Sequence, residues 1–113
     1  MTEITMTSKK LNNNTRQFII TDAVHNVIRT YGAIIDSTDV WIVVTENING
    51  MTTNIQNFYL SDCAQLMSSI RDFVEFALIK ENKNKNFDFT VNKITLIYVK
   101  HIVEIMEIML LGR

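Results

Sequence analysis

Residues 40–59 read VWIVVTENINGMTTNIQNFY, and this is the part of the chain that most clearly favours one structure. Residues 40–45 are rich in β-branched and aromatic side chains, which favour strands. Asn49-Gly50 is a preferred pair for a two-residue type I′ turn, because both central positions of that turn need a positive φ. The stretch therefore predicts a β-hairpin centred on this turn, with three cross-strand pairs: Val44–Ile55, Trp41–Phe58 and Val40–Tyr59.

The segment after the hairpin has the pattern of an amphipathic helix. Ser61 is a good N-cap, and Asp62 suits the positive end of the helix dipole. The apolar residues recur at helical spacing and form one stripe: Cys63, Leu66, Met67, Ile70, Phe73, Val74, Ala77 and Leu78. We expect a helix from Ser61 to about Lys80 that buries this stripe.

Upstream of the hairpin, residues 14–32 also predict a helix. Asn14 can cap it, and Gly32 suits its end. Apolar side chains lie at helical spacing between them: Ile20, Ala23, Val24, Val27, Ile28 and Tyr31. The β-branched run at 19–21 disfavours the first turn, so the helix could begin only at Asp22. Residues 1–14 are more polar and predict a mobile arm or a short edge strand.

The C-terminal third allows two interpretations. Phe87, Phe89 and Val91 alternate with polar residues, which predicts a strand that pairs with residues 94–99 and leads into a final helix. Alternatively, residues 93–111 form one long helix. We favour the strand followed by the helix, because residues 87–91 need a partner and residues 94–99 are rich in β-branched side chains.

Taken together, these patterns predict a mobile arm at residues 1–14 and a single α+β domain at residues 15–113. The expected architecture is a small, mostly antiparallel sheet made of two hairpins and accompanied by three helices. The expected order of elements is α-β-β-α-β-β-α.

Composition excludes several classes of protein. The chain has 113 residues, 11 basic against 12 acidic side chains and a formal charge of -1, so it is not a basic protein that coats nucleic acid. No apolar run is long enough to span a membrane, and the N-terminus does not have the pattern of a secretion signal. We expect a cytoplasmic protein. Frequent Ile, Asn and Lys are typical of AT-rich genomes, so it could be a phage or viral accessory protein in its host's cytoplasm.

The sequence has few of the parts that catalysis needs. Three scattered glycines form no phosphate-binding loop, so no cofactor is expected. Cys63 is the only thiol, and its place on the apolar stripe favours packing in the core. His101, Glu104 and Glu107 have the spacing of metal ligands and would need a further group such as His25. A charged outer helix face is the favoured interpretation, so we expect neither a metal site nor an enzyme.

The feature that most suggests a function is an excess of apolar side chains. Trp41, Val43 and Phe58 are expected on the second face of a short hairpin, and Ile105 and Met109 on the last helix. Monomers rarely leave such surface in water, and two-fold self-association would cover it. We therefore expect a non-catalytic binding protein that acts through protein–protein interaction. It would be a homo-oligomer with a regulatory or inhibitory role.

Two alternatives remain open. The first is a small-molecule or nucleotide-binding module with a pocket at a subunit junction, lined by Arg29, Trp41 and Tyr59. The second is nucleic-acid binding through one of two small basic groups. One group consists of Lys9, Lys10, Arg16 and Arg29. The other is the loop with Lys80, Lys83 and Lys85, behind which Phe87 and Phe89 could stack on bases. Small basic groups of this kind are usually solubilising, so nucleic-acid binding is not favoured.

Overall fold

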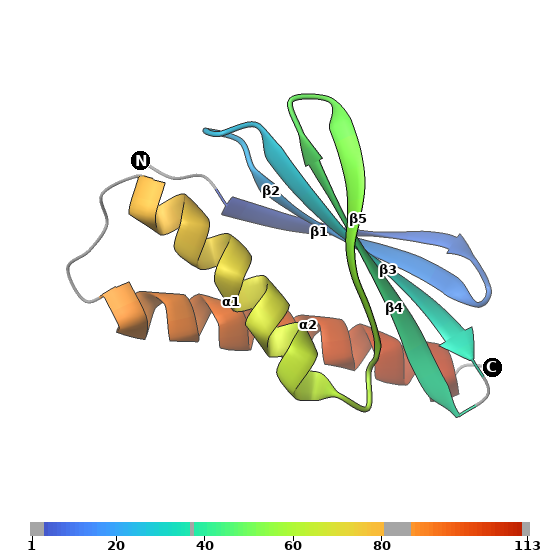
Figure 1. The fold of residues 1–113 in the computed structure, drawn as a ribbon. Helices are drawn as coiled ribbons and strands as arrows, with labels where there is room; N and C mark the ends of the chain where they lie inside the picture. Colours follow the sequence, from blue (N-terminus) through green and yellow to red (C-terminus); the bar gives the residue numbers. More distant parts are fainter. Residues whose placement is uncertain (1–3, 37, 81–86, 112–113) are drawn as a thin grey trace.

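Five strands come first in the chain and two helices follow (Figure 1). The computed structural model describes residues 4–36, 38–80 and 87–111. The strands are β1 (Ile4–Asn12), β2 (Thr15–Asp22), β3 (Val27–Asp36), β4 (Asp39–Ile48) and β5 (Met51–Tyr59), and the helices are α1 (Cys63–Lys80) and α2 (Phe87–Leu111).

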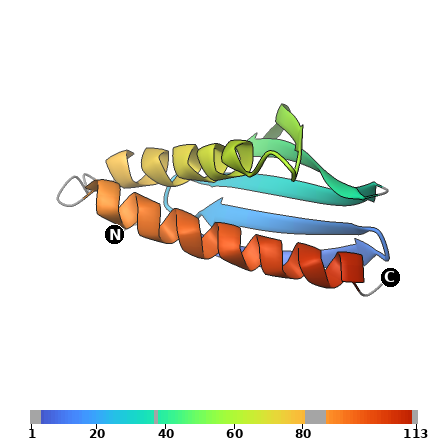
Figure 2. The ribbon, with the colours of Figure 1, turned by 90° about the horizontal axis from the view of Figure 1, so that it is seen from below.

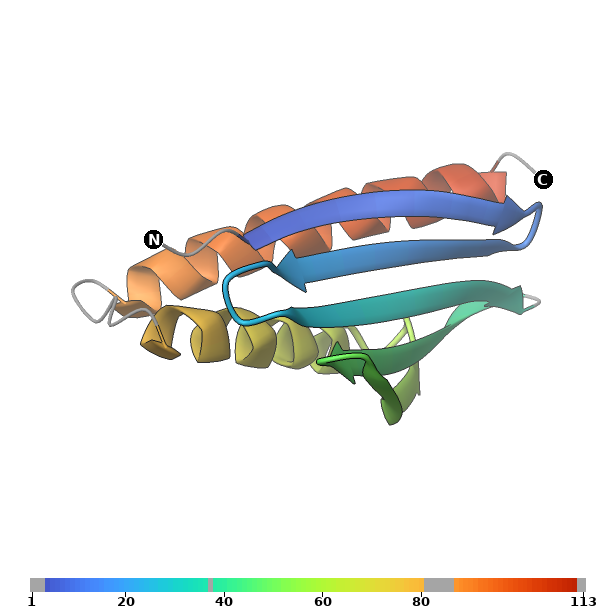
Figure 3. The same cartoon turned by 90° about the horizontal axis from the view of Figure 1, so that it is seen from above.

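The strands form one sheet in the order β1-β2-β3-β4-β5, and each strand is antiparallel to the next. Residues 4–12, for which the sequence allowed either an arm or an edge strand, form the edge strand β1. Helices α1 and α2 contact each other and lie side by side on one face of the sheet (Figure 2). In the view from the opposite side, no described helix lies over the sheet (Figure 3). The molecule therefore has two layers, and one face of the sheet is open.

The prediction of a helix at residues 14–32 is wrong, because this stretch forms strands β2 and β3. Phe18 and Ile20 are buried at alternate positions of β2, and Tyr31 and Ala33 at alternate positions of β3. This period of two is that of a strand with one face in the core. The turn between them contains Asn26 with a φ of 54°, a conformation that asparagine tolerates.

The prediction of two strands at residues 87–99 is also wrong. The single helix α2 covers these positions and starts earlier than the alternative helix at 93–111. Its buried residues are Val91, Thr95, Ile102 and Met106, whose spacings of four and seven put them on one helical face. The order of elements is thus β-β-β-β-β-α-α with two helices, and the fold is α+β with an antiparallel sheet.

The hairpin at 40–59 is confirmed, but its predicted register is wrong. Asn49 and Gly50 have φ values of 52° and 90°, as a type I′ turn requires. Beyond the turn, the register shifts between Val44 and Thr45, where a β-bulge leaves Ile55 without a partner across the strand. The shift pairs Ile42 with Phe58 and Trp41 with Tyr59, so Phe58 points to the helices and Tyr59 to the open face.

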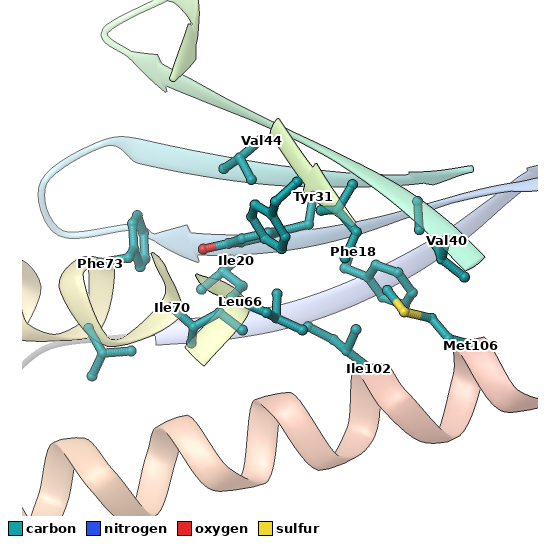
Figure 4. Packing of buried hydrophobic residues seen from close by; sticks show 14 of the residues in the cluster. Phe18, Ile20, Tyr31, Val40, Val44, Leu66, Ile70, Phe73, Ile102 and Met106 are labelled. Atoms are coloured by element: carbon teal, nitrogen blue, oxygen red, sulfur yellow. The ribbon is translucent and has the colours of Figure 1, made fainter. Parts of the chain in front are cut away.

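The core lies between the sheet and the helices (Figure 4). The sheet contributes Phe18, Ile20, Tyr31, Val40 and Val44, and the helices contribute Leu66, Ile70, Phe73, Ile102 and Met106. Most of the stripe predicted for α1 is buried as expected. Met67, which is 38% exposed, and Cys63 are the exceptions. Cys63 begins the helix at the surface, where its thiol donates to the carbonyl oxygen of Leu60 at 3.3 Å. Neither α1 nor α2 has a stretch long and apolar enough to cross a membrane.

Candidate binding surface

The open face of the sheet is built from alternate residues of all five strands. Cross-strand partners and alternating burial place these residues on it: Thr5, Thr7, Lys9, Thr15, Gln17, Ile19, Thr21, Ile28, Thr30, Gly32, Ile34, Asp39, Trp41, Val43, Thr45, Asn47, Thr52, Asn54, Asn57 and Tyr59. Small hydroxyl and amide side chains dominate, and apolar side chains lie among them. Figure 3 looks onto this face.

The largest apolar side chains gather at one end of the open face. Ile34 lies opposite Trp41, and Trp41 lies opposite Tyr59, so the three form a row across β3, β4 and β5. The rings of Trp41 and Tyr59 have centroids 4.8 Å apart and are tilted by 60°. Ile34 is 40% exposed and Tyr59 is 42% exposed, so water reaches the row. With Val43 in the adjacent row, these four residues form what we call the Trp41 patch.

Charged side chains occur only at the margins of the described part of this face. Lys9 lies on the edge strand β1, and Asp39 lies at the start of β4. Asp39 is held locally, because its Oδ1 accepts from the backbone N–H of Val40 at 2.8 Å and of Ser61 at 3.3 Å. The centre of the face is therefore neutral.

The structure divides the residues that the sequence suggested for a partner interface. Trp41 and Val43 lie together on the open face. Phe58 is only 7% exposed and packs in the core on the other side of the sheet. Ile105 and Met109 are half-buried on α2, where Ile105 packs against the core. Ile34 was missed because it falls between the helix predicted at 14–32 and the hairpin predicted at 40–59, where no strand was expected.

The residues suggested for a ligand pocket are divided in the same way. Trp41 and Tyr59 are in contact on the open face, whereas Arg29 lies on the side that the helices cover. There its Nε and Nη2 donate to Oε2 of Glu46 at 3.1 and 2.5 Å, and its Nη1 donates to the carbonyl oxygen of Ser69 at 2.7 Å. The guanidinium also lies 5.2 Å from the ring centroid of Phe73. The Arg29 charge is thus used to join β3, β4 and α1.

Tyr31 belongs to the same buried group. Its hydroxyl lies 3.1 Å from Oγ of Ser69. Burial raises the pKa of Tyr31, because the phenolate would be poorly solvated, and the hydrogen bond to Ser69 and the charge of Arg29 offset this only in part. Burial alone would lower the pKa of Arg29, but Tyr31 and Glu46 outweigh it, so this pKa is raised and Arg29 remains charged.

A cavity of about 280 Å³ lies beside this group, between the ends of β3 and β4 and helix α1. Its walls are Val27, Arg29, Glu46, Ile48, Asp72, Phe73 and Phe76. Since Glu46 neutralises Arg29, the carboxylate of Asp72 leaves the walls with a net negative charge. The size is close to the lower limit of small-ligand pockets in proteins.

The candidate catalytic and metal-binding residues are not brought together. His25 pairs with the buried carboxylate of Asp22, whose Oδ2 lies 2.6 Å from His25 Nδ1, and so holds the turn between β2 and β3. His101, Glu104 and Glu107 lie on the exposed arc of α2. Within residues 4–36, 38–80 and 87–111, no group of three His, Cys, Asp or Glu side chains could hold a metal ion. Lys83 and Lys85 lie outside the described residues.

Comparisons of the chain with protein-family models, with curated proteins and with solved structures gave no match. Function must therefore be inferred from the geometry of this chain.

Proposed function

We propose that this protein acts by binding another protein through the open face of its sheet. The observation that carries the proposal is the position of the Trp41 patch, which lies on a face that no described helix covers. An exposed cluster of aromatic and aliphatic side chains beside polar ones is typical of interaction sites. Tryptophan and tyrosine are also the residues most enriched among those that dominate binding energy at interfaces.

We further propose a non-catalytic role, regulatory or inhibitory. In support, the buried charged groups serve packing, since Arg29 is paired with Glu46 and Asp22 with His25. The proposal includes a cytoplasmic location, which would be the host cytoplasm if the chain is a viral accessory protein. The composition of the chain supports that location.

Capture with matched variants tests the proposed face. Tagged wild type, Val43→Glu and Ile97→Glu are each immobilised and exposed to a lysate of the organism that encodes the chain. Ile97 is 55% exposed on α2, so its variant adds the same charge on the opposite side of the molecule. We expect wild type and Ile97→Glu to retain the same partner and Val43→Glu to lose it. Equal retention by all three would contradict the proposed face.

The cavity beside Arg29 supports a second candidate function, the binding of a small organic cation. The carboxylate of Asp72 would pair with a protonated amine, and the ring of Phe76 could contact its apolar part or its charge. An anionic nucleotide is a poorer candidate here, because Glu46 and the Ser69 carbonyl already occupy the donors of Arg29.

A thermal-shift screen with nucleotides and with primary amines separates these ligands, because a ligand of the folded state raises Tm. We expect amines to raise Tm in wild type and not in Asp72→Asn. A response to nucleotides alone, or an equal response in both proteins, would refute the cation site.

A further inference from the structure

The size, charge and symmetry of the open face indicate what kind of partner it binds. We infer that its occupant is a second copy of this chain, packed sheet against sheet about a two-fold axis. This inference rests on the proposed function and names the partner for the same surface.

The area of the face fits a stable dimer. Strands of about nine residues that rise about 3.3 Å each, in a five-stranded sheet with strands about 4.8 Å apart, give an upper limit of roughly 30 by 24 Å, or about 700 Å², because the sheet is twisted (Figure 1). Two copies would bury at most about 1,400 Å², which is within the range of specific protein interfaces.

The charge distribution favours a second copy over an unrelated partner. In a two-fold interface the same patch meets itself, so any charge near the axis would face a like charge. The described centre of the face is neutral and carries threonine and asparagine side chains, which can both donate and accept hydrogen bonds. Unrelated partners are commonly matched by opposite charges, and the described charges on this face, on Lys9 and Asp39, lie only at its margins.

The order of the strands indicates which residues meet. In such a dimer the two-fold axis lies in the plane between the two sheets and passes over the centre of each face. Because β3 is the middle of five strands, this axis brings β3 of one copy over β3 of the other. Thr30 lies near the middle of β3, between Ile19 on β2 and Thr45 on β4. The Thr30 side chains of the two copies are therefore expected to lie near each other, and the Trp41 patches are covered at the same time.

The wild-type protein gives the first test. Its molar mass is measured by light scattering from about 1 to 500 µM, which brackets micromolar affinities. We expect twice the 13.1 kDa of one chain at the upper end. Trp41, the only tryptophan, should shift to shorter emission wavelengths and become less accessible to acrylamide as the mass rises. A constant 13.1 kDa with unchanged Trp41 emission would overturn the inference.

A pair of charge variants gives the second test. Thr30→Glu and Thr30→Lys each place like charges against each other, so each alone should dimerise at least about 100-fold more weakly than wild type. An equimolar mixture brings opposite charges together and should recover the doubled mass. Circular dichroism checks that both variants are folded, and Ile97→Glu on α2 should dimerise like wild type. Dimers of either variant alone, or a folded mixture that stays monomeric, would contradict the two-fold arrangement.

The tests separate this inference from the proposed function. If the wild type stays monomeric and Val43→Glu still abolishes capture of a different protein, the face binds proteins but not its own copy. If the wild type stays monomeric and Val43→Glu captures the same proteins as wild type, both proposals are wrong.

Discussion

Glu46→Gln should destabilise the protein far more than an ordinary surface substitution. The change keeps the size of the side chain and removes the negative charge of the carboxylate, whose Oε2 accepts two hydrogen bonds from Arg29. The two residues lie opposite each other on β3 and β4. Their side chains are 12% and 20% exposed, for Arg29 and Glu46 respectively, so the pair is mostly shielded from water.

The expected magnitude lies between two limits. Exposed ion pairs contribute about 0–1 kcal/mol, whereas removal of one partner from a fully buried pair costs about 3–5 kcal/mol. After Glu46→Gln, Arg29 keeps the Ser69 carbonyl and the ring of Phe73, and water reaches part of the site. We therefore expect a loss of about 2 kcal/mol in the free energy of unfolding.

Urea unfolding followed by Trp41 emission measures this loss. With m near 1–3 kcal/mol/M, the midpoint should fall by about 1 M. All proteins are compared at one concentration, because self-association would make stability depend on concentration. The difference from wild type should change little with added salt, since shielded pairs are poorly screened.

Glu104→Gln on the exposed arc of α2 is the matched control and should stay within about 0.5 kcal/mol of wild type. A double-mutant cycle with Arg29→Met should give a coupling energy of about 1 kcal/mol between the two side chains. The reasoning would be refuted by a Glu46→Gln midpoint equal to that of Glu104→Gln, or by effects of Arg29→Met and Glu46→Gln that simply add.

Four further substitutions and a pH titration test other parts of the structure. Burial raises the pKa of Tyr31 and of Tyr98, so the folded state holds these protons above the ordinary tyrosine pKa of about 10. The folded state then binds more protons than the unfolded state, so stability should be constant up to about pH 9 and decline above pH 10. Urea midpoints between pH 8 and 11 measure this, and Tyr31→Phe should flatten the decline; a stability that rises with pH would contradict the assignment. Gly50→Ala should cost about 1 kcal/mol by thermal unfolding, because φ is 90° and no atom lies within 4 Å of the added Cβ. Ile70→Ala should cost about 3 kcal/mol because Ile70 is fully buried, whereas Ile79→Ala at a 57% exposed site should cost less than about 0.5 kcal/mol; equal losses would place Ile70 outside the core.

Several features were predictable from short stretches of sequence. Asn49-Gly50 encodes its own turn, because few other residue pairs adopt two consecutive positive φ values. Helix α1 was also predictable, since Ser61 and Asp62 mark its start and its apolar stripe has a single period. The alternation of residues 40–45 also put Trp41 and Val43 on one face of their strand, where both are half-buried.

The remaining parts of the fold depended on contacts between distant residues. The stretch at 15–36 is apolar enough to match both a helical and a strand period, and pairing of β2 and β3 with β1 and β4 selected the strand. The stretch at 87–99 has strand-like residues, yet α2 forms there because Val91, Thr95 and Ile102 reach the core only from a helix. The bulge at Ile55 reversed which of Phe58 and Tyr59 faces the solvent. Local sequence thus specified the turns and the amphipathic stripe of α1, while burial in one shared core decided the other elements and left the Trp41 patch uncovered, because both helices pack on the opposite face.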